Sequence, residues 1–112
     1  MSKIISLCKN YEFQRLYRKG KSSVKPTMVV YVGKGIRQNV RLGITASKKL
    51  GCAVIRNRAK RRIREIFRIL LPQLRDGIDI CVVARGRLID SDFEVLLKDF
   101  KSALSECNAF KD

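Results

Sequence analysis

The chain reads Ala53-Val-Ile-Arg-Asn-Arg-Ala-Lys-Arg-Arg-Ile-Arg-Glu-Ile-Phe-Arg-Ile-Leu-Leu71 over residues 53–71. The apolar residues in this stretch recur at helical spacing and form one stripe: Ile55, Ala59, Ile63, Ile66, Phe67 and Leu70. This period predicts an amphipathic helix that buries the stripe against a core. Pro72 comes next and is expected to end the helix, because the residue before a proline disfavours helical geometry.

Segments with the character of strands lie on both sides of this helix. Before it come the β-rich residues 28–32 and residues 40–47, in which apolar and polar side chains alternate. The alternation puts Val40, Leu42 and Ile44 on one face and Arg41, Gly43 and Thr45 on the other. We expect these two segments to pair as a hairpin. Residues 78–84 are almost continuously apolar, which is typical of a central strand in a covered sheet.

Two further helices are predicted near the ends of the chain. The first begins at the N-cap candidate Asn10 and ends at Gly20. The second begins at Ser91, which with Glu94 forms a capping-box pattern. The resulting order, α-β-β-α-β-α, predicts an α/β fold, a two-layer sandwich around a small central sheet. The 112 residues suffice for one domain, which we assign to residues 1–112.

Positive charge is concentrated in the first two thirds of the chain. The sequence has 25 Lys and Arg against 10 Asp and Glu, a net charge of +15. Residues 1–75 hold 20 of these cations and only two acids, whereas residues 76–112 hold five cations and eight acids. Such segregation of charge on a small domain predicts a polyanionic partner.

The densest cations lie between residues 48 and 68, where nine Lys and Arg face the single acid Glu65. Arg56, Lys60 and Arg64 follow one another at i+4 spacing, where like charges destabilise a helix. A solvated surface is the alternative interpretation, but such surfaces usually mix charges of both signs. The preference for arginine also fits forked contacts to phosphates. We therefore expect this helix face to bind nucleic acid.

Aromatic side chains offer a second mode of nucleic-acid binding. Phe13 and Tyr17 are one helical turn apart, and Tyr31 lies in the first predicted strand. Bases of single strands stack on such rings. Packing into the core is the stronger expectation for Phe13, whereas the polar tips of Tyr17 and Tyr31 suit a half-open cleft.

The composition argues against several other functions. The sequence has no histidine, which removes the commonest general base and zinc ligand. Its four cysteines are widely spaced and are expected to be reduced, buried hydrophobes in a cytoplasmic protein. Four acids, Asp76, Asp79, Asp90 and Asp92, are expected to flank turns and a helix start rather than bind metal. No apolar run is long enough to span a membrane.

The basic stretch and its surroundings resemble a known family. The run Ala53-Val-Ile-Arg-Asn-Arg-Ala-Lys-Arg-Arg-Ile-Arg64, preceded by Ser47-Lys-Lys-Leu-Gly51, resembles the RNR signature of the bacterial ribonuclease P protein subunit. Residues 13–20, 28–31, 41–47 and 80–85 resemble other segments of that family in the same order. Tyr17 differs from the phenylalanine that is frequent there, and the segment before Asn10 has fewer cations than we would expect.

The resemblance implies a role in tRNA maturation. Such a subunit belongs to a cytoplasmic ribonucleoprotein endoribonuclease that removes the 5′ leader of precursor tRNA. In that family the RNA subunit carries out hydrolysis with Mg²⁺, which the RNA mainly holds. The protein has no catalytic residue or metal site of its own, needs no other protein partner, and binds the catalytic RNA and the leader. The resemblance also implies a left-handed βαβ crossover, where general rules favour a right-handed one.

The resemblance carries over to two groups of residues. The leader cleft would comprise Phe13, Tyr17, Tyr31, Thr45, Ser47, Lys48 and Lys49. The RNA-binding face of the signature helix would comprise Arg56, Asn57, Arg58, Lys60, Arg61, Arg64 and Arg68.

Three other functions remain to be compared with this one. A ribosomal or tRNA-binding protein would share the basic surface without a preference for the leader. A protein-only nuclease is disfavoured by the missing histidine and the scattered carboxylates. A helix-turn-helix DNA-binding protein is disfavoured because the basic helix lies between strands.

Overall fold

The computed structural model describes residues 5–6, 10–35 and 39–111 of the chain. The strands are β1 (Ile5–Ser6), β2 (Lys21–Val24), β3 (Met28–Lys34), β4 (Arg41–Thr45) and β5 (Ile78–Ala84). The α-helices are α1 (Asn10–Lys19), α2 (Ala53–Leu70), α3 (Gly86–Asp90) and α4 (Phe93–Glu106). Two short 3₁₀ helices, η1 (Lys48–Leu50) and η2 (Leu71–Gln73), flank α2.

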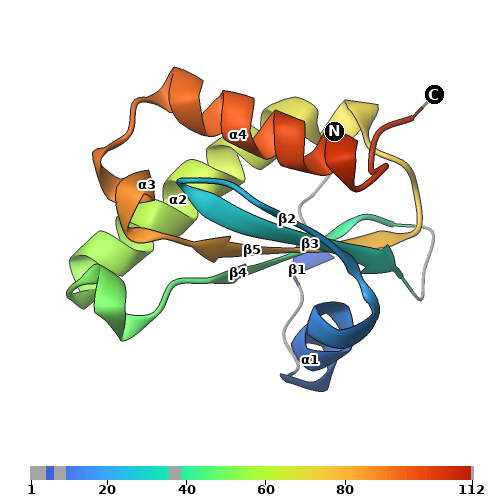
Figure 1. Ribbon diagram of the computed structural model, residues 1–112, viewed down its shortest axis with the longest axis horizontal. Helices are drawn as coiled ribbons and strands as arrows, with labels where there is room; N and C mark the ends of the chain where they lie inside the picture. Colours follow the sequence, from blue (N-terminus) through green and yellow to red (C-terminus); the bar gives the residue numbers. More distant parts are fainter. Residues whose placement is uncertain (1–4, 7–9, 36–38, 112) are drawn as a thin grey trace.

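The strands form one mixed sheet in the order β1-β4-β5-β3-β2. Strand β5 lies at its centre, parallel to β4 and antiparallel to β3. Helices α2 and α4 cover one face of the sheet, and α1 lies against the other (Figure 1). The central position predicted for residues 78–84 is confirmed, and it explains their apolar character, because both faces of β5 are covered.

The predicted hairpin between residues 28–32 and 40–47 is wrong. Strand β5 lies between β3 and β4, so these two strands are not neighbours. Strand β3 instead forms a hairpin with β2, a strand that the sequence analysis missed, with Val24 opposite Val29. β2 was hard to recognise because three of its four residues are exposed, so its sequence lacks a clear apolar alternation.

The connection from β4 through α2 to β5 joins two parallel neighbours. In Figure 1 both strands point left and α2 returns above the sheet, with β4 farther from the viewer than β5. The path therefore turns clockwise as it advances toward the viewer, which makes the crossover left-handed. This agrees with the implied hand and is the rare alternative to the usual right-handed unit.

The main core lies between the sheet and the helices α2 and α4. Alternate residues of β3 and β5 point into it, among them Met28, Val30, Ile80 and Val82. Five residues of the predicted α2 stripe are buried there: Ala59, Ile63, Ile66, Phe67 and Leu70. The rings of Phe67 and Phe100 stack with centroids 6.4 Å apart. The predicted α/β sandwich is thereby confirmed.

The helices after β5 begin differently from the prediction. The short helix α3 was not predicted, and α4 begins at Phe93 with Asp92 as its N-cap. The expected capping box is wrong, because no side chain caps α4 and the hydroxyl of Ser91 donates to the carbonyl of Arg87. The other missed strand, β1, has only two residues and carries no sequence period.

Candidate nucleic-acid interface

The sheet face under α1 carries the side chains that alternate away from the main core. The register aligns them in rows across the strands, because paired residues point to the same face. One row joins Arg41 to Asp79, and the next joins Gly43 through Cys81 to Tyr31. A third row pairs Thr45 with Val83. Helix α1 lies over these rows from one side, so its own residues complete the surface.

Tyr17 and Tyr31 form an aromatic pair where α1 meets this sheet face. Their ring centroids are 4.8 Å apart and their planes make an angle of 65°, an edge-to-face contact. The Tyr17 hydroxyl lies 3.3 Å from Thr45 Oγ1 and 3.7 Å from Cys81 Sγ. Burial raises the pKa of Tyr17, so the hydroxyl remains a neutral hydrogen-bonding group near pH 7. Tyr17 nevertheless keeps 41% of its surface exposed.

Phe13 completes the cluster from one turn earlier in α1. It is half-buried and packs, with Tyr31 and Val83, around the fully covered pair Leu16 and Cys81. The expectation of core packing for Phe13 is therefore met only in part, since the ring is neither buried nor free. The structure brings together Phe13, Tyr17, Tyr31 and Thr45, four of the seven residues predicted for the cleft. We call these four residues the aromatic cluster.

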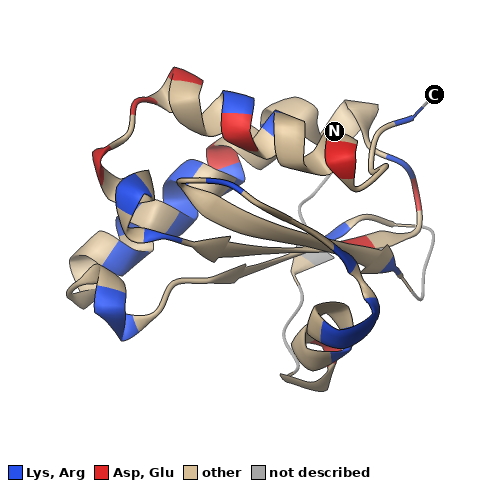
Figure 2. Cartoon of the chain, viewed as in Figure 1, with Lys and Arg blue, Asp and Glu red and all other residues tan. Residues whose placement is uncertain are grey.

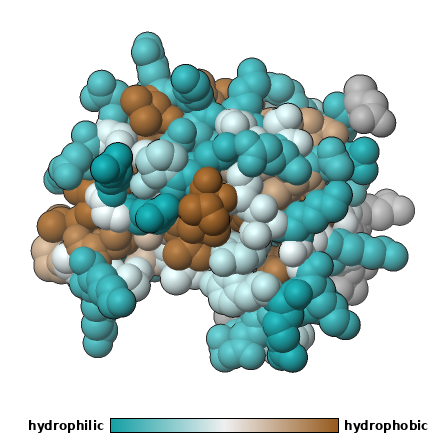
Figure 3. Space-filling model, in the orientation of Figure 1, coloured by the Kyte–Doolittle hydropathy of each residue, from teal (hydrophilic) through white to brown (hydrophobic). Residues whose placement is uncertain are grey.

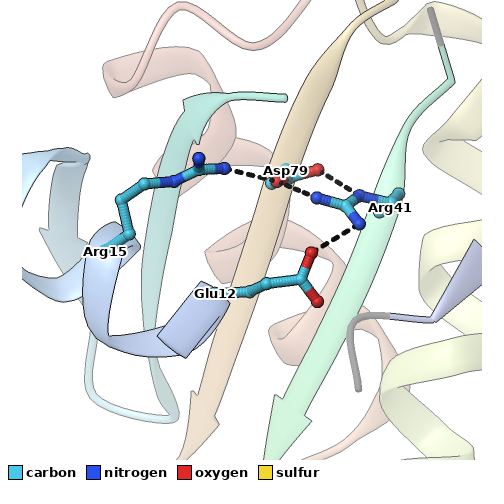
Figure 4. Close-up of polar contacts among 4 residues, drawn as sticks. All are labelled: Glu12, Arg15, Arg41 and Asp79. Carbon is cyan, nitrogen blue, oxygen red and sulfur yellow. Dashed lines mark hydrogen bonds and ion pairs between the residues drawn. The ribbon is translucent and has the colours of Figure 1, made fainter. Parts of the chain in front are cut away.

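A network of charged side chains, which the sequence analysis missed, joins α1 to the sheet (Figure 4). Arg41 donates two hydrogen bonds to the Asp79 carboxylate, at 2.8 and 2.7 Å, and its Nη1 lies 2.6 Å from Glu12 Oε2. Arg15 Nη2 lies 3.6 Å from Asp79 Oδ2. The bonds to Asp79, and then those to Glu12, raise the pKa of Arg41. The expectation that Asp79 flanks a turn is wrong, because it is buried within β5.

The other three predicted cleft residues follow β4 along the chain. Ser47 precedes η1, and Lys48 and Lys49 lie within it; all three are exposed. Helices α2 and α3 both lie next to η1 in space. The lysines therefore lie at the end of the sheet where the basic helix begins, beyond the aromatic cluster.

The predicted cations of α2 lie on the side of the helix that faces away from the core. Asn57, Arg58, Arg61, Arg64 and Arg68 are exposed, and Arg56 and Lys60 are half-buried. Val54, Asn57, Arg58 and Arg61 line a shallow hollow of about 340 Å³. Helix α2 and helix α1, which carries Phe13 and Tyr17, lie on opposite faces of the sheet (Figure 1).

Two arginines of α2, Arg56 and Arg62, are only partly exposed to solvent. Arg62 donates from Nη1 to the carbonyl of Leu88 at 2.9 Å and from Nη2 to that of Ser91. It therefore ties α2 to the segment around α3. The Nε of Arg56 is buried and has no hydrogen-bond partner among the described residues.

Charge is divided between the elements as the sequence predicts. Figure 2 shows Lys and Arg along α1 and α2, whereas acids gather along α4 and just before it. The face seen in Figure 3 is largely hydrophilic, and its apolar residues appear as separate patches. The face shown in Figure 3 therefore lacks the broad apolar patch that is typical of an obligate protein interface.

The described residues also bear on the cysteines, membranes and metals. Cys81 and Cys107 are buried free thiols as expected, Cys52 is exposed, contrary to the expectation, and Cys8 lies outside the described residues. In the described ranges, no helix has the length and apolar character to cross a membrane. Nor do the described Cys, Asp and Glu residues form any group of three that could hold a metal ion.

Comparisons with known proteins agree on one family. A family model described as Ribonuclease P matches residues 1–108. The ribonuclease P protein component of Thermoanaerobacter sp. (strain X514) is 36% identical over 102 residues, which cover 91% of this chain and 88% of that protein. The component of Clostridium botulinum (strain Langeland) is 42% identical over 97 residues, covering 86% and 84%.

Solved structures show the same similarity in three dimensions. The RNase P protein of Staphylococcus aureus superposes with a TM-score of 0.84 at 37% identity, over 97% of this chain and all of that one. The RNase P protein of Thermotoga maritima gives a TM-score of 0.77 at 32% identity, over 87% of this chain and 92% of that one.

Proposed function

This chain belongs to the bacterial ribonuclease P protein family, which makes it a tRNA-processing subunit, and we propose that it binds two RNA elements. One is the catalytic RNA subunit, which meets the basic face of α2. The other is the 5′ leader of precursor tRNA, which lies on the aromatic cluster. Hydrolysis belongs to the RNA, and the place of action is the cytoplasm.

The half-exposed pair Tyr17 and Tyr31 is the observation that carries leader binding. Rings held edge to face, on a sheet face that α1 covers only in part, leave edges and faces open to stacking. A single-stranded leader offers unstacked bases, whereas the bases of the mature acceptor stem are paired. Lys48 and Lys49, in η1 shortly after β4, supply phosphate contacts for the same RNA strand.

The arginine-rich face of α2 supports binding of the catalytic RNA. Its cations are exposed side by side with only Glu65 to offset them, 3.6 Å from Arg61. An exposed ion pair of this kind is worth little, so these arginines remain free for phosphates. The proposed contacts are Arg56, Asn57, Arg58, Lys60, Arg61, Arg64 and Arg68.

The carboxylates that the structure describes do not fit a catalytic magnesium site. Two of them on the α1 side of the sheet, Glu12 and Asp79, are buried against Arg41, which occupies both oxygens of Asp79 and Oε2 of Glu12. Magnesium prefers carboxylate oxygens together with water or phosphate ligands. The proposal therefore leaves Mg²⁺ with the RNA and gives the protein a binding role alone.

A comparison of two substrates tests leader binding. Holoenzyme reconstituted with the catalytic RNA is titrated with leader-bearing and mature tRNA, using wild type and Tyr31→Ala. Loss of a stacked ring should weaken leader-bearing tRNA by about 1–3 kcal/mol and leave mature tRNA unaffected. Equal weakening of both would remove Tyr31 from the cleft and favour a general tRNA-binding protein.

The division of labour has a separate test. Protein without RNA should leave precursor tRNA intact, and adding the catalytic RNA and Mg²⁺ should restore cleavage at the 5′ end. Metal-dependent cleavage by nuclease-free protein alone would contradict the proposal.

A further inference from the structure

The charged network of Glu12, Arg15, Arg41 and Asp79 links the first helix to two strands of the sheet (Figure 4). Asp79 is 1% exposed and Glu12 is 5% exposed, so both carboxylates have lost their water. Arg41 lies between them with one nitrogen on Glu12 and two on Asp79. Three elements, α1, β4 and β5, thus meet at one guanidinium.

Such a buried network is not explained by stability alone. Desolvation of the charges offsets much of their attraction, and well-packed apolar side chains in their place are often as stable. Charged groups with fixed hydrogen-bond directions instead define the relative positions of the elements that they join. Arg41 and Asp79 are register partners on neighbouring strands, and their two parallel bonds fix the plane of the guanidinium.

The fixed guanidinium in turn positions one turn of α1. Its remaining nitrogen, Nη1, points to Glu12, the residue immediately before Phe13. Arg15, three residues after Glu12 in α1, forms an ion pair with Asp79. Leu16 then rests on Gly33, where an added Cβ would lie 2.6 Å from Leu16 Cδ2. Helix α1 is therefore held both by directed charge and by a close steric fit.

We propose that the network acts as a positioning device for leader recognition. By fixing the register of α1 on β4 and β5, Glu12, Arg41 and Asp79 set the distance and angle at which Tyr17 meets Tyr31. None of the three touches the leader; they act through the aromatic cluster. This inference rests on the proposed function, since it assumes that the cluster binds the leader.

The test removes one of the two charged links that α1 makes, the one through Glu12, and leaves Arg41 paired with Asp79 on the sheet. In Glu12→Ala, Arg41 keeps Asp79, and α1 loses its directed contact to Arg41. Reconstituted holoenzyme should bind leader-bearing precursor tRNA about fivefold more weakly, the low end for one lost stacking contact, and mature tRNA unchanged. Glu12→Gln keeps an oxygen acceptor for Arg41 and should recover most of the leader preference.

Glu106→Ala is the matched control. Glu106 also joins a helix to the sheet, through Ser23 of β2 and Lys25 just after β2, but it does so from α4, on the other face of the sheet (Figure 1). Its removal should lower the melting temperature without changing the ratio of leader-bearing to mature tRNA affinity. If Glu106→Ala reduces that ratio as much as Glu12→Ala does, general destabilisation explains the effect and the proposal is overturned.

Near-ultraviolet circular dichroism reports the ring geometry directly. The chain has three tyrosines and no tryptophan, so in a Tyr11→Phe background the tyrosine band comes from Tyr17 and Tyr31. Glu12→Ala should reduce this band, and Glu12→Gln should restore it. If Glu12→Ala fails to fold, Arg41→Lys replaces it. This variant keeps the positive charge but lacks the paired N–H donors of the guanidinium, and it should lose both the leader preference and the tyrosine band. A folded variant with an unchanged band and leader preference would overturn the proposal.

Tyr17→Ala separates this inference from the proposed function. If Tyr17→Ala loses leader preference and Glu12→Ala does not, the cluster binds the leader but the network does not position it. If neither variant loses the preference, the assignment of the cluster itself is wrong, and the inference falls with it.

Discussion

Arg61 and Arg62 are adjacent on α2, yet their side chains have opposite environments. Arg62 is half-buried and donates to the carbonyls of Leu88, within α3, and of Ser91, which directly follows α3. Arg61 is 81% exposed along its side chain, and Glu65 lies 3.6 Å from its Nε. One arginine therefore holds the fold together and the other faces solvent, although the sequence presents them as equivalent cations.

This difference predicts opposite results for two alanine substitutions. Arg62→Ala should lower the free energy of unfolding by about 2 kcal/mol, because partly buried carbonyls lose a charged donor. Arg61→Ala should change it by less than about 0.5 kcal/mol, as expected for an exposed side chain. Urea denaturation followed by circular dichroism measures both values. Equal values for the two variants would contradict the assignment.

Arg61→Ala should instead weaken the salt dependence of binding to the catalytic RNA. Loss of one phosphate contact should lower the slope of log affinity against log salt by about 0.7 for a single strand. Lys101→Ala, which removes an exposed cation from the acidic helix α4, is the control and should leave the slope unchanged. A lower slope for assembly with the catalytic RNA would agree with the proposed contact, whereas a lower slope for leader-bearing tRNA alone would place Arg61 on the leader instead.

Anions should stabilise the native protein. The net charge of +15 repels itself in the compact state, and the cations exposed side by side on α2 offer sites to sulfate or phosphate. A ligand that binds the native state more tightly than the unfolded chain raises stability by mass action. Thermal melts should therefore rise with sulfate relative to chloride at matched ionic strength, and equal melting temperatures would refute this expectation.

The contact between α4 and β2 should make stability depend on acid pH. Hydrogen bonds from Lys25 and Ser23 hold the pKa of Glu106 below its ordinary value of 4.5. A carboxyl with a lowered pKa in the native state contributes stability above 4.5, and loses it as the pH falls through the native value. Glu106→Gln should therefore have a lower free energy of unfolding than wild type at pH 7. The difference between the two proteins should become smaller toward pH 3. A difference independent of pH would contradict the ion pair.

Cys52 should be the most reactive of the three described cysteines. Backbone N–H groups of Ile55 and Val54, at the start of α2, lower the pKa of its exposed thiol, whereas burial raises the pKa values of Cys81 and Cys107. Iodoacetamide should therefore label Cys52 first, since the thiolate is the nucleophile. Peptide mass spectrometry over a time course measures the order, with Cys52→Ser as the control.

Local periods in the sequence determined much of the fold and of the candidate site. The helical stripe of α2, the apolar run of β5 and the alternation of β4 were all recognisable, because burial on one face or both imposes a period on the chain. The alternation also placed Arg41 and Thr45 on a common face. Because Phe13 and Tyr17 are one turn apart, their shared side of α1 was evident as well.

Tertiary structure alone decided which elements became neighbours. No local period shows that β5 inserts between β3 and β4, or that β2 pairs with β3, because pairing depends on the packing of segments far apart in the chain. For the same reason the sequence predicted a turn residue at Asp79. Its burial in β5 beside Arg41 depends on contacts between segments far apart in the chain. The separate roles of Arg61 and Arg62 depend on where α3 lies, a position set by long-range contacts and not by the helix that carries both arginines.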